Sequence, residues 1–294
     1  MIECICEILT REKVQIMRKN RLVAPVVKWV GGKRQLLDDL TPLFPKRVTS
    51  YCEPFLGGGA VLFKLQPNIA YINDINSELI QMYEVIRDNV DELIIALGEH
   101  PNEEDHFYRV RDWDRNKEQY GQLTKVQKAA RIIYLNKTCY NGLFRVNNAG
   151  EFNTPFGHYK NPNIVNAPTL KAVSAYFQKA QLTFSSVDYA EVIANVAKGT
   201  FVYLDPPYDP VSDTANFTGY AKGGFDRSEQ IRLRQCCDEL NQRGIKFMLS
   251  NSATDFIREQ YAAYNITIVK AKRAINSNVA KRGQVDEVVV RNYE

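Results

Sequence analysis

Short apolar runs with the composition of β-strands recur along this chain, and helical patterns separate most of the later ones. The strand-like runs occupy residues 24–27, 70–72, 200–204, 246–249, 266–269 and 287–290, and helical patterns occupy residues 228–243 and 254–263. Short runs rich in β-branched and aromatic residues are typical of strands. Strands that alternate with helices favour a mostly parallel sheet covered by helices. The sequence therefore predicts an α/β fold.

The alternation stops between residues 77 and 165. Residues 78–97 and 125–135 have helical patterns, and the part between them is charged and rich in Tyr, Trp and Arg. Residues 143–146 and 151–154 flank Asn147-Asn148-Ala149-Gly150, which is typical of a hairpin because Asn and Gly tolerate positive φ. We therefore predict a helical and hairpin domain at 77–165, inserted into a larger domain formed by 20–76 and 166–294. Residues 1–19 precede both as an N-terminal extension, in which one helix face would carry Ile2, Ile5, Leu9 and Ile16.

The composition indicates in which cellular compartment the protein works and which cofactors it is unsuited to bind. A chain of 294 residues fits one large domain or a domain with an insertion. Its net charge is only +4, so affinity for nucleic acid would come from local basic patches. The six cysteines form no C-x-x-C pair and there are three histidines, which disfavours a zinc site and predicts a reduced, cytoplasmic protein. Charged residues throughout the first twenty positions exclude a secretory signal or a membrane span.

The tetrapeptide Asp205-Pro206-Pro207-Tyr208 directly follows the apolar run 200–204. Its residues suit methylation of an exocyclic amine, whose lone pair is delocalised into the ring. The Asp205 carboxylate can accept a hydrogen bond from such an amine, and the Pro206 carbonyl can serve as a second acceptor on a backbone of fixed φ. Tyr208 offers a flat face on which an extruded base could stack. The plainer alternative is a strand that ends in a proline turn.

Two glycine-rich segments lie towards the N-terminus. Residues 53–59 end in Gly57-Gly58-Gly59, where the backbone can approach a ligand closely, but they do not match G-x-G-x-x-G. Asp74 follows a strand-like run 17 residues beyond Gly57, close to the spacing at which an acid meets ribose hydroxyls. The alternative is a glycine turn with a helix N-cap at Asn73 or Asp74.

The second segment is Lys28-Trp29-Val30-Gly31-Gly32-Lys33. Its paired glycines let the chain pass close to a ligand, Trp29 can stack on it, and Lys33 can meet a carboxylate. An ordinary strand-to-helix turn with a buried Trp would have the same sequence.

The ordered motifs K-W-x-G-G-K, E-P-F-x-G-G-G, N-D-I-N, Y-N-G-L-x-R, P-F-G-x-Y and D-P-P-Y resemble those of Dam-type DNA adenine-N6 methyltransferases, which include DpnII-type modification enzymes. The similarity runs from about Asn20 to the C-terminus. It implies a Rossmann-like, S-adenosylmethionine-dependent methyltransferase sheet, interrupted by an inserted helical and hairpin DNA-recognition domain. The implied reaction is methylation of adenine within GATC in double-stranded DNA.

The resemblance also implies roles for individual residues. The implied cofactor-binding residues are Trp29, Lys33, Phe55, Gly57, Asp74 and Asp205. Those implied to hold the flipped adenine are Asp205, Pro206 and Tyr208. Those implied to contact DNA are Lys28, Tyr140, Asn141, Leu143, Arg145 and Tyr159. Two positions depart from the family pattern: His158 stands where relatives commonly have Arg, and Phe144 lies within the hairpin motif.

The residue types of the insertion suit duplex recognition. Arginine can bond both acceptors of guanine in the major groove, and an aromatic side chain can occupy an opened base stack. Without the resemblance, a solvated strand charge is the favoured interpretation of Arg145 and a core aromatic that of Tyr140. Residues 270–282 carry five positive charges and no negative one, which favours phosphate contact over a merely solvated basic loop.

We expect direct methyl transfer by alignment of the reactants, without a covalent enzyme intermediate and without a metal. Three alternatives stay open at this point: a cytosine-N4 or RNA amino-methyltransferase, a dinucleotide-dependent oxidoreductase, and a catalytically silent DNA-binding relative. A monomer is the simplest expectation, with a cognate restriction endonuclease as a functional partner rather than a stable complex.

Overall fold

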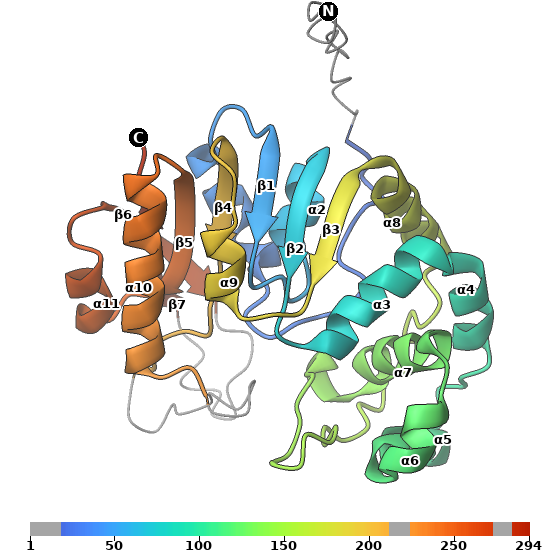
Figure 1. Cartoon of the computed structure of the whole chain (residues 1–294). Coiled ribbons are helices and arrows are strands. Elements are labelled where there is room, and N and C mark those ends of the chain that lie inside the picture. The colour runs from blue at the N-terminus through green and yellow to red at the C-terminus, as the bar shows by residue number, and fades with distance from the viewer. Residues whose placement is uncertain (1–18, 212–223, 273–283) are drawn as a thin grey trace, which may run out of the picture.

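The computed structural model describes residues 19–211, 224–272 and 284–294, and within them a seven-stranded sheet forms the centre of the molecule (Figure 1). Its strands follow the order β3-β2-β1-β4-β5-β7-β6. Neighbours from β3 to β5 are parallel, whereas β7 runs antiparallel to both β5 and β6. The bounds are β1 Ser50–Glu53, β2 Ile69–Asn73, β3 Gln181–Ser185, β4 Thr200–Leu204, β5 Lys246–Ser252, β6 Asn265–Lys272 and β7 Gln284–Arg291. The predicted α/β class is confirmed.

Helices cover the sheet and extend beyond one of its edges. Figure 1 shows α9 and α10 in front of the sheet, and α3 to α7 gathered beyond the edge formed by β3. The bounds are α1 Leu37–Leu40, α2 Ala60–Leu65, α3 Ser77–Asp88, α4 Val90–Gly98, α5 Glu104–Arg111, α6 Lys117–Gln122, α7 Lys125–Thr138, α8 Ala167–Lys179, α9 Tyr189–Ala194, α10 Arg227–Gln242 and α11 Asp255–Gln260. No helix of the described residues is long and apolar enough to cross a membrane.

Five of the predicted strand-like runs lie within strands of the sheet, namely 70–72 in β2, 200–204 in β4, 246–249 in β5, 266–269 in β6 and 287–290 in β7. All five residues of β4 are buried, as expected for a central parallel strand. The predicted strand at 24–27 is wrong, although Val26 and Val27 are buried. Pro25 has no N–H group that could pair with a neighbouring strand. Lys28, the first residue after the run, forms its backbone hydrogen bonds with the side chain of Asn136 and not with a strand.

The chain order of the strands reverses between β1 and β4. From β1 the chain proceeds outward through β2 to β3, and it then returns to place β4 on the other side of β1. In open α/β sheets, ligands bind at the carboxyl ends of the strands, at such a reversal. Glu53 ends β1 and Asp205 directly follows β4, so both lie at this edge.

The region between α3 and the hairpin shares its core with the sheet. One hydrophobic cluster includes Tyr51 and Ile72 of the sheet together with Phe107, Ile133 and Phe156. The predicted helix at 78–97 is two helices, because the backbone leaves the helical region at Asn89. The division at 76/77 and 165/166 into an inserted domain stays a prediction.

The predicted hairpin is present as a short pairing rather than as regular strands. Val146 pairs with Phe152, and backbone bonds join Asn147 to Glu151 and Asn153 to Arg145. The predicted N-terminal helix face with Ile2, Ile5, Leu9 and Ile16, and most of the basic segment 270–282, lie outside the described residues.

Candidate active site

An ion pair between Lys33 and Asp205 lies at the strand-order reversal. The Lys33 Nζ atom is 2.7 Å from Asp205 Oδ1, and the two side chains are 3% and 18% exposed. Lys33 also donates a hydrogen bond of 2.6 Å to the carbonyl of Gly31, so the turn at Gly31 holds the ammonium in place. Burial raises the pKa of Asp205 to about 6, although the nearby Lys33 charge acts in the opposite direction. Asp205 is thus a stronger proton acceptor than an ordinary carboxylate.

The prolines after Asp205 differ in how their carbonyls are used. The Pro207 carbonyl accepts a hydrogen bond of 2.8 Å from Gln230 Nε2. No donor bonds the carbonyl of the buried Pro206 in the part of the chain that the structure describes. Pro206 therefore presents an acceptor beside the Asp205 carboxylate.

Tyr208 is held from two directions. Its hydroxyl donates a hydrogen bond of 2.7 Å to Glu287 Oε2, and Lys33 Nζ lies 4.7 Å from the centroid of its ring. Glu287 belongs to β7, far from Tyr208 in sequence, and the prediction missed it. The bond to Glu287 fixes the plane of the ring on which a base would stack.

A buried network of hydrogen bonds holds the loop that follows β4. Asn251 donates 3.0 Å to Gln230 and accepts 3.1 Å from the backbone N–H of Asp209. The carboxylate of Asp209 accepts a hydrogen bond from the Thr254 hydroxyl, and the backbone carbonyl of Asp209 accepts one from the Ser252 hydroxyl. Because buried polar groups specify geometry when they are fully bonded, this network fixes the backbone that follows β4.

Asp74 holds the glycine turn that follows β1. Its Oδ2 accepts 2.8 Å from the Gly57 N–H, while Tyr83 donates 3.0 Å to the Gly57 carbonyl. Gly57 has φ +50°, and a Cβ there would lie 2.9 Å from Trp29 Cδ1. Burial raises the pKa of Asp74. The N-cap alternative for Asn73 or Asp74 is wrong, because Asn76 caps α3.

Glu53 adds a third carboxyl group to this edge, and the prediction assigned it no role. It is 2% exposed and accepts 2.8 Å from the Tyr51 hydroxyl. Burial raises its pKa well above the ordinary value, and the charges of Asp205 and Asp74 act in the same direction. Glu53, Asp74 and Asp205 thus surround a region in which Lys33 supplies the neighbouring positive charge.

Two aromatic residues border this edge. Trp29 stacks on Phe144 with ring centroids 4.7 Å apart and an angle of 22° between the ring planes. Phe55 contacts Tyr189 at 5.1 Å and Phe225 at 5.9 Å between ring centroids. Trp29 therefore joins the glycine turn to the hairpin, which explains why a bulky aromatic at position 144 is accommodated.

Among the predicted DNA-contacting residues, Lys28 lies against the turn that carries Tyr140 and Asn141. Tyr140 is 56% exposed, so the core alternative for this residue is wrong. Asn141 has φ +57° in the exposed turn beside it. Lys28 is exposed, and its stem lies so close to Gly142 that a Cβ at Gly142 would be 2.7 Å from Lys28 Cδ. Lys28 and the turn of residues 140–142 therefore form one continuous surface.

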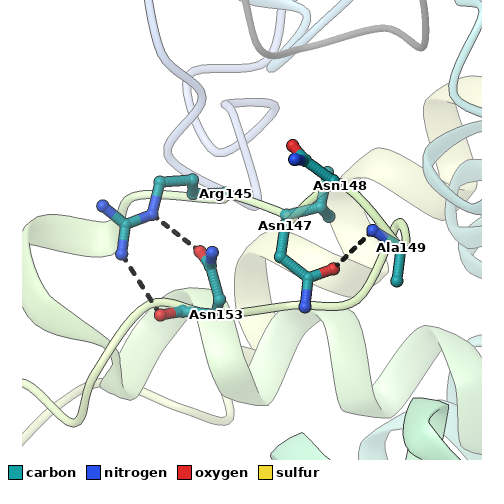
Figure 2. Close-up of a pocket in the computed structure, with 6 residues that line it drawn as sticks. Arg145, Asn147, Asn148, Ala149 and Asn153 are labelled. Atoms are coloured by element: carbon teal, nitrogen blue, oxygen red, sulfur yellow. Dashed lines mark hydrogen bonds between the residues drawn. The ribbon is translucent and has the colours of Figure 1, made fainter.

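Arg145 projects across the hairpin (Figure 2). Its Nε donates 2.7 Å to the Asn153 side chain, and its Nη2 donates 3.2 Å to the Asn153 carbonyl. An open hollow in this face is lined by Arg145, Val146, Asn147, Asn148, Ala149 and Asn153. Leu143 is half-buried, and Tyr159 bonds through its carbonyl to Asn102. Four of the six lining side chains, those of Arg145, Asn147, Asn148 and Asn153, are polar hydrogen-bonding groups of the kind that contact nucleic acid.

The fold is a Rossmann-like α/β sheet, with carboxyl groups and a glycine turn at the strand-order reversal and an exposed turn and a hairpin nearby. The chain belongs to the D12 class N6 adenine-specific DNA methyltransferases, whose family model matches residues 29–275.

Three relatives illustrate the similarity. The chain is 39% identical to the type II methyltransferase M1.LlaDCHI of Lactococcus lactis subsp. cremoris, over 95% of this chain and 99% of the relative. It is 41% identical to the type II methyltransferase M.MjaIII of Methanocaldococcus jannaschii, over 92% and 99%. It is 37% identical to the DNA adenine methylase of Escherichia coli strain K12, over 93% and 95%.

The family and enzyme class predicted from the sequence are thereby confirmed. The protein is an adenine-specific DNA methyltransferase, and the oxidoreductase alternative is wrong. The roles assigned to individual residues stay predictions.

Proposed function

We propose that this enzyme transfers a methyl group from S-adenosylmethionine to N6 of an adenine swung out of double-stranded DNA, within the sequence GATC. The observation that carries the proposal is the pair of acceptors at the strand-order reversal. The Asp205 carboxylate and the uncommitted Pro206 carbonyl lie side by side in sequence, next to the flat ring of Tyr208.

The residues at this edge fit S-adenosylmethionine. When bound, this donor supplies an electrophilic methyl group on a positively charged sulfonium centre. Burial raises the pKa of Glu53, Asp74 and Asp205, so the charged form of each carboxylate is disfavoured. A cationic ligand nearby would stabilise that charged form, and this makes the edge suitable for a cation. The glycine turn lets the backbone approach the ligand. The residues that would hold the donor are Trp29, Lys33, Phe55, Gly57, Asp74 and Asp205.

Asp205 and Pro206 would accept the two N–H groups of the exocyclic amine and hold its lone pair towards the methyl carbon. Asp205 would take the proton that N6 loses when it gains the methyl group from the bound donor. The raised pKa of Asp205, about 6, suits this role. Tyr208 would stack on the adenine, and no metal ion enters the scheme.

On the DNA side, the exposed Tyr140 and Asn141 would occupy the space that opens when the base leaves the stack. Lys28, Leu143, Arg145 and Tyr159 would contact the surrounding base pairs and backbone. The choice of GATC rests on the resemblance of the Y-N-G-L-x-R and P-F-G-x-Y motifs. Since two similar chains are type II methyltransferases, a restriction endonuclease of the same specificity is the functional partner we propose.

The chemical part of the proposal is tested by following methyl-labelled S-adenosylmethionine into DNA. Asp205→Ala should abolish transfer while DNA binding survives, because Asp205 would contact the extruded base and the donor but not the DNA on either side of that base. Asp238→Ala is a matched control, since it removes another ion-paired carboxylate, on α10, and should leave turnover near normal. Near-normal turnover of Asp205→Ala would refute the assignment.

The sequence choice is tested on duplexes that carry GATC or a single-base variant of it. The wild-type enzyme should label the GATC duplex selectively. Arg145→Ala should lose discrimination at one base pair by about 5- to 150-fold, the range that 1–3 kcal/mol per bidentate contact implies. Unchanged discrimination would count against Arg145 as a reader of bases.

A further inference from the structure

Asn136, near the end of α7, uses its side-chain amide to hold two segments of backbone together. Its side chain is buried, with 1% exposure. Oδ1 accepts 2.8 Å from the N–H of Lys28, and Nδ2 donates 2.7 Å to the Lys28 carbonyl and 3.1 Å to the Gly142 carbonyl. Both N–H groups and the oxygen of the amide are therefore engaged, which is the condition for a buried amide to be tolerated.

The amide does for Lys28 what a neighbouring strand would do. It bonds both the N–H and the C=O of this residue, and no other hydrogen bond to the Lys28 backbone exists among the residues that the structure describes. This explains why the apolar run at 24–27 ends in an irregular segment that is nevertheless fixed. The position of the exposed Lys28 side chain thus depends on Asn136.

The third bond reaches the turn that presents Tyr140 and Asn141. Gly142 ends this turn with φ +65°, and a Cβ there would lie 2.7 Å from Lys28 Cδ and 3.3 Å from the Asn136 carbonyl oxygen. The turn, Lys28 and Asn136 are therefore packed without spare room. A displacement of either segment would break a bond to the amide.

An apolar residue would be the ordinary choice at this position. Ile132, Ile133 and Leu135 of the same helix are buried in the hydrophobic cluster. Burial of a polar amide on such a face adds no stability by itself. Its hydrogen bonds instead fix the relative position of the backbone segments that they join. Here the geometry concerns two segments that were predicted to contact DNA and that lie more than 100 residues apart in the chain.

We propose that Asn136 is a positioning residue for target recognition, which locks Lys28 and the turn of residues 140–142 into one rigid DNA-reading surface. The inference rests on the proposed function. Asn136 itself touches no DNA, because its side chain is buried. It acts by keeping the side chain of Lys28 at a fixed distance from the wedge formed by Tyr140 and Asn141.

The test compares Asn136→Ala with a matched control, Asn292→Ala. Asn292 makes a similar set of bonds, accepting 2.9 Å from the Phe247 N–H and donating 2.9 Å to the Ile245 carbonyl, but at the amino end of β5. Asn136→Ala should raise KM for GATC duplex and weaken discrimination against single-base variants by about tenfold or more, with KM for S-adenosylmethionine changed less than about twofold. Asn292→Ala should change neither.

A double-mutant comparison separates positioning from a general loss of stability. In a Lys28→Ala background, the Asn136→Ala change should cost several-fold less in kcat/KM for DNA than it does in the wild type, because part of what it positions is already absent. If Asn136→Ala does not fold, the isosteric Asn136→Asp, which loses both donors, should show the same pattern.

Two outcomes overturn the inference: Asn136 variants that behave like Asn292→Ala in DNA kinetics, or costs that are equal in the Lys28→Ala and wild-type backgrounds. Failure of the proposed function looks different, because the wild-type enzyme itself would then show no selective methyl incorporation into GATC duplex.

Discussion

Replacing Asp205 by Asn should make the folded enzyme more stable at pH 8 while abolishing methyl transfer. Burial raises the pKa of this carboxyl to about 6 from the ordinary value of 3.8, despite the ion pair with Lys33. The stability that the protonated carboxyl provides is complete below its unfolded pKa and is lost as the pH rises through 6. Asn resembles the protonated form at every pH and still offers an oxygen to Lys33.

The magnitude follows from the two pKa values. Since one pKa unit corresponds to about 1.4 kcal/mol, the charged carboxylate costs the folded state about 3 kcal/mol at pH 8. At pH 5 roughly half of this cost remains, because the folded protein has largely regained the proton. For a chain of 294 residues, about 3 kcal/mol corresponds to a rise in Tm of roughly 5 °C.

Calorimetric Tm values of the wild type and Asp205→Asn at pH 5 and pH 8 provide the measurement. Asp188→Asn is a control of opposite sign, since hydrogen bonding to Arg232 lowers the pKa of Asp188. That variant should lose stability at pH 8, and its deficit should shrink as the pH falls towards the ordinary pKa. A Tm of Asp205→Asn at or below the wild-type value at pH 8, or an equal advantage at both pH values, would refute the reasoning.

Three further changes test the surrounding framework. Gly57→Ala should lower stability by about 1–2 kcal/mol in urea titrations, because of its positive φ and the clash with Trp29, whereas Gly98→Ala, with open space around it, should not. Tyr208→Phe should lower kcat less than Tyr208→Ala, since it keeps the ring and loses only the hydroxyl with its bonds to Glu287 and Asp205; equal losses would argue against stacking. Asp114→Asn should destabilise by about 3–5 kcal/mol, because it removes the negative charge 2.7 Å from the buried Arg131, which then keeps hydrogen bonds to the carbonyls of Val110 and Arg111; a loss below about 1 kcal/mol would contradict this.

The sequence predicts those strands whose own residues form a recognisable apolar run. The run at 200–204 coincides with β4 because both faces of a central strand are buried. Strands β1 and β3 escaped prediction, since β1 has only four residues and β3 carries polar residues at a partly exposed edge. The strand prediction at 24–27 was wrong because a buried loop and a buried strand can contain the same apolar residues.

The candidate site divides in the same way. Asp205, Asp74 and Gly57 could be proposed from the sequence because each belongs to a compact motif at a strand end. Glu287 and Asn136 could not be found, because their partners lie 79 and 108 residues away. Only the pairing of β5 with β7 brings Glu287 to Tyr208, and no local pattern reports that pairing.

The most direct test of the central claim is a crystal structure with a GATC duplex and an analogue of S-adenosylmethionine that cannot give up its methyl group. We predict an extruded adenine whose amino group lies within hydrogen-bonding distance of the Asp205 carboxylate and the Pro206 carbonyl, with the donor held between Gly57, Asp74 and Lys33. An adenine that stays stacked in the duplex, or a donor bound away from the carboxyl ends of β1 and β4, would contradict the account.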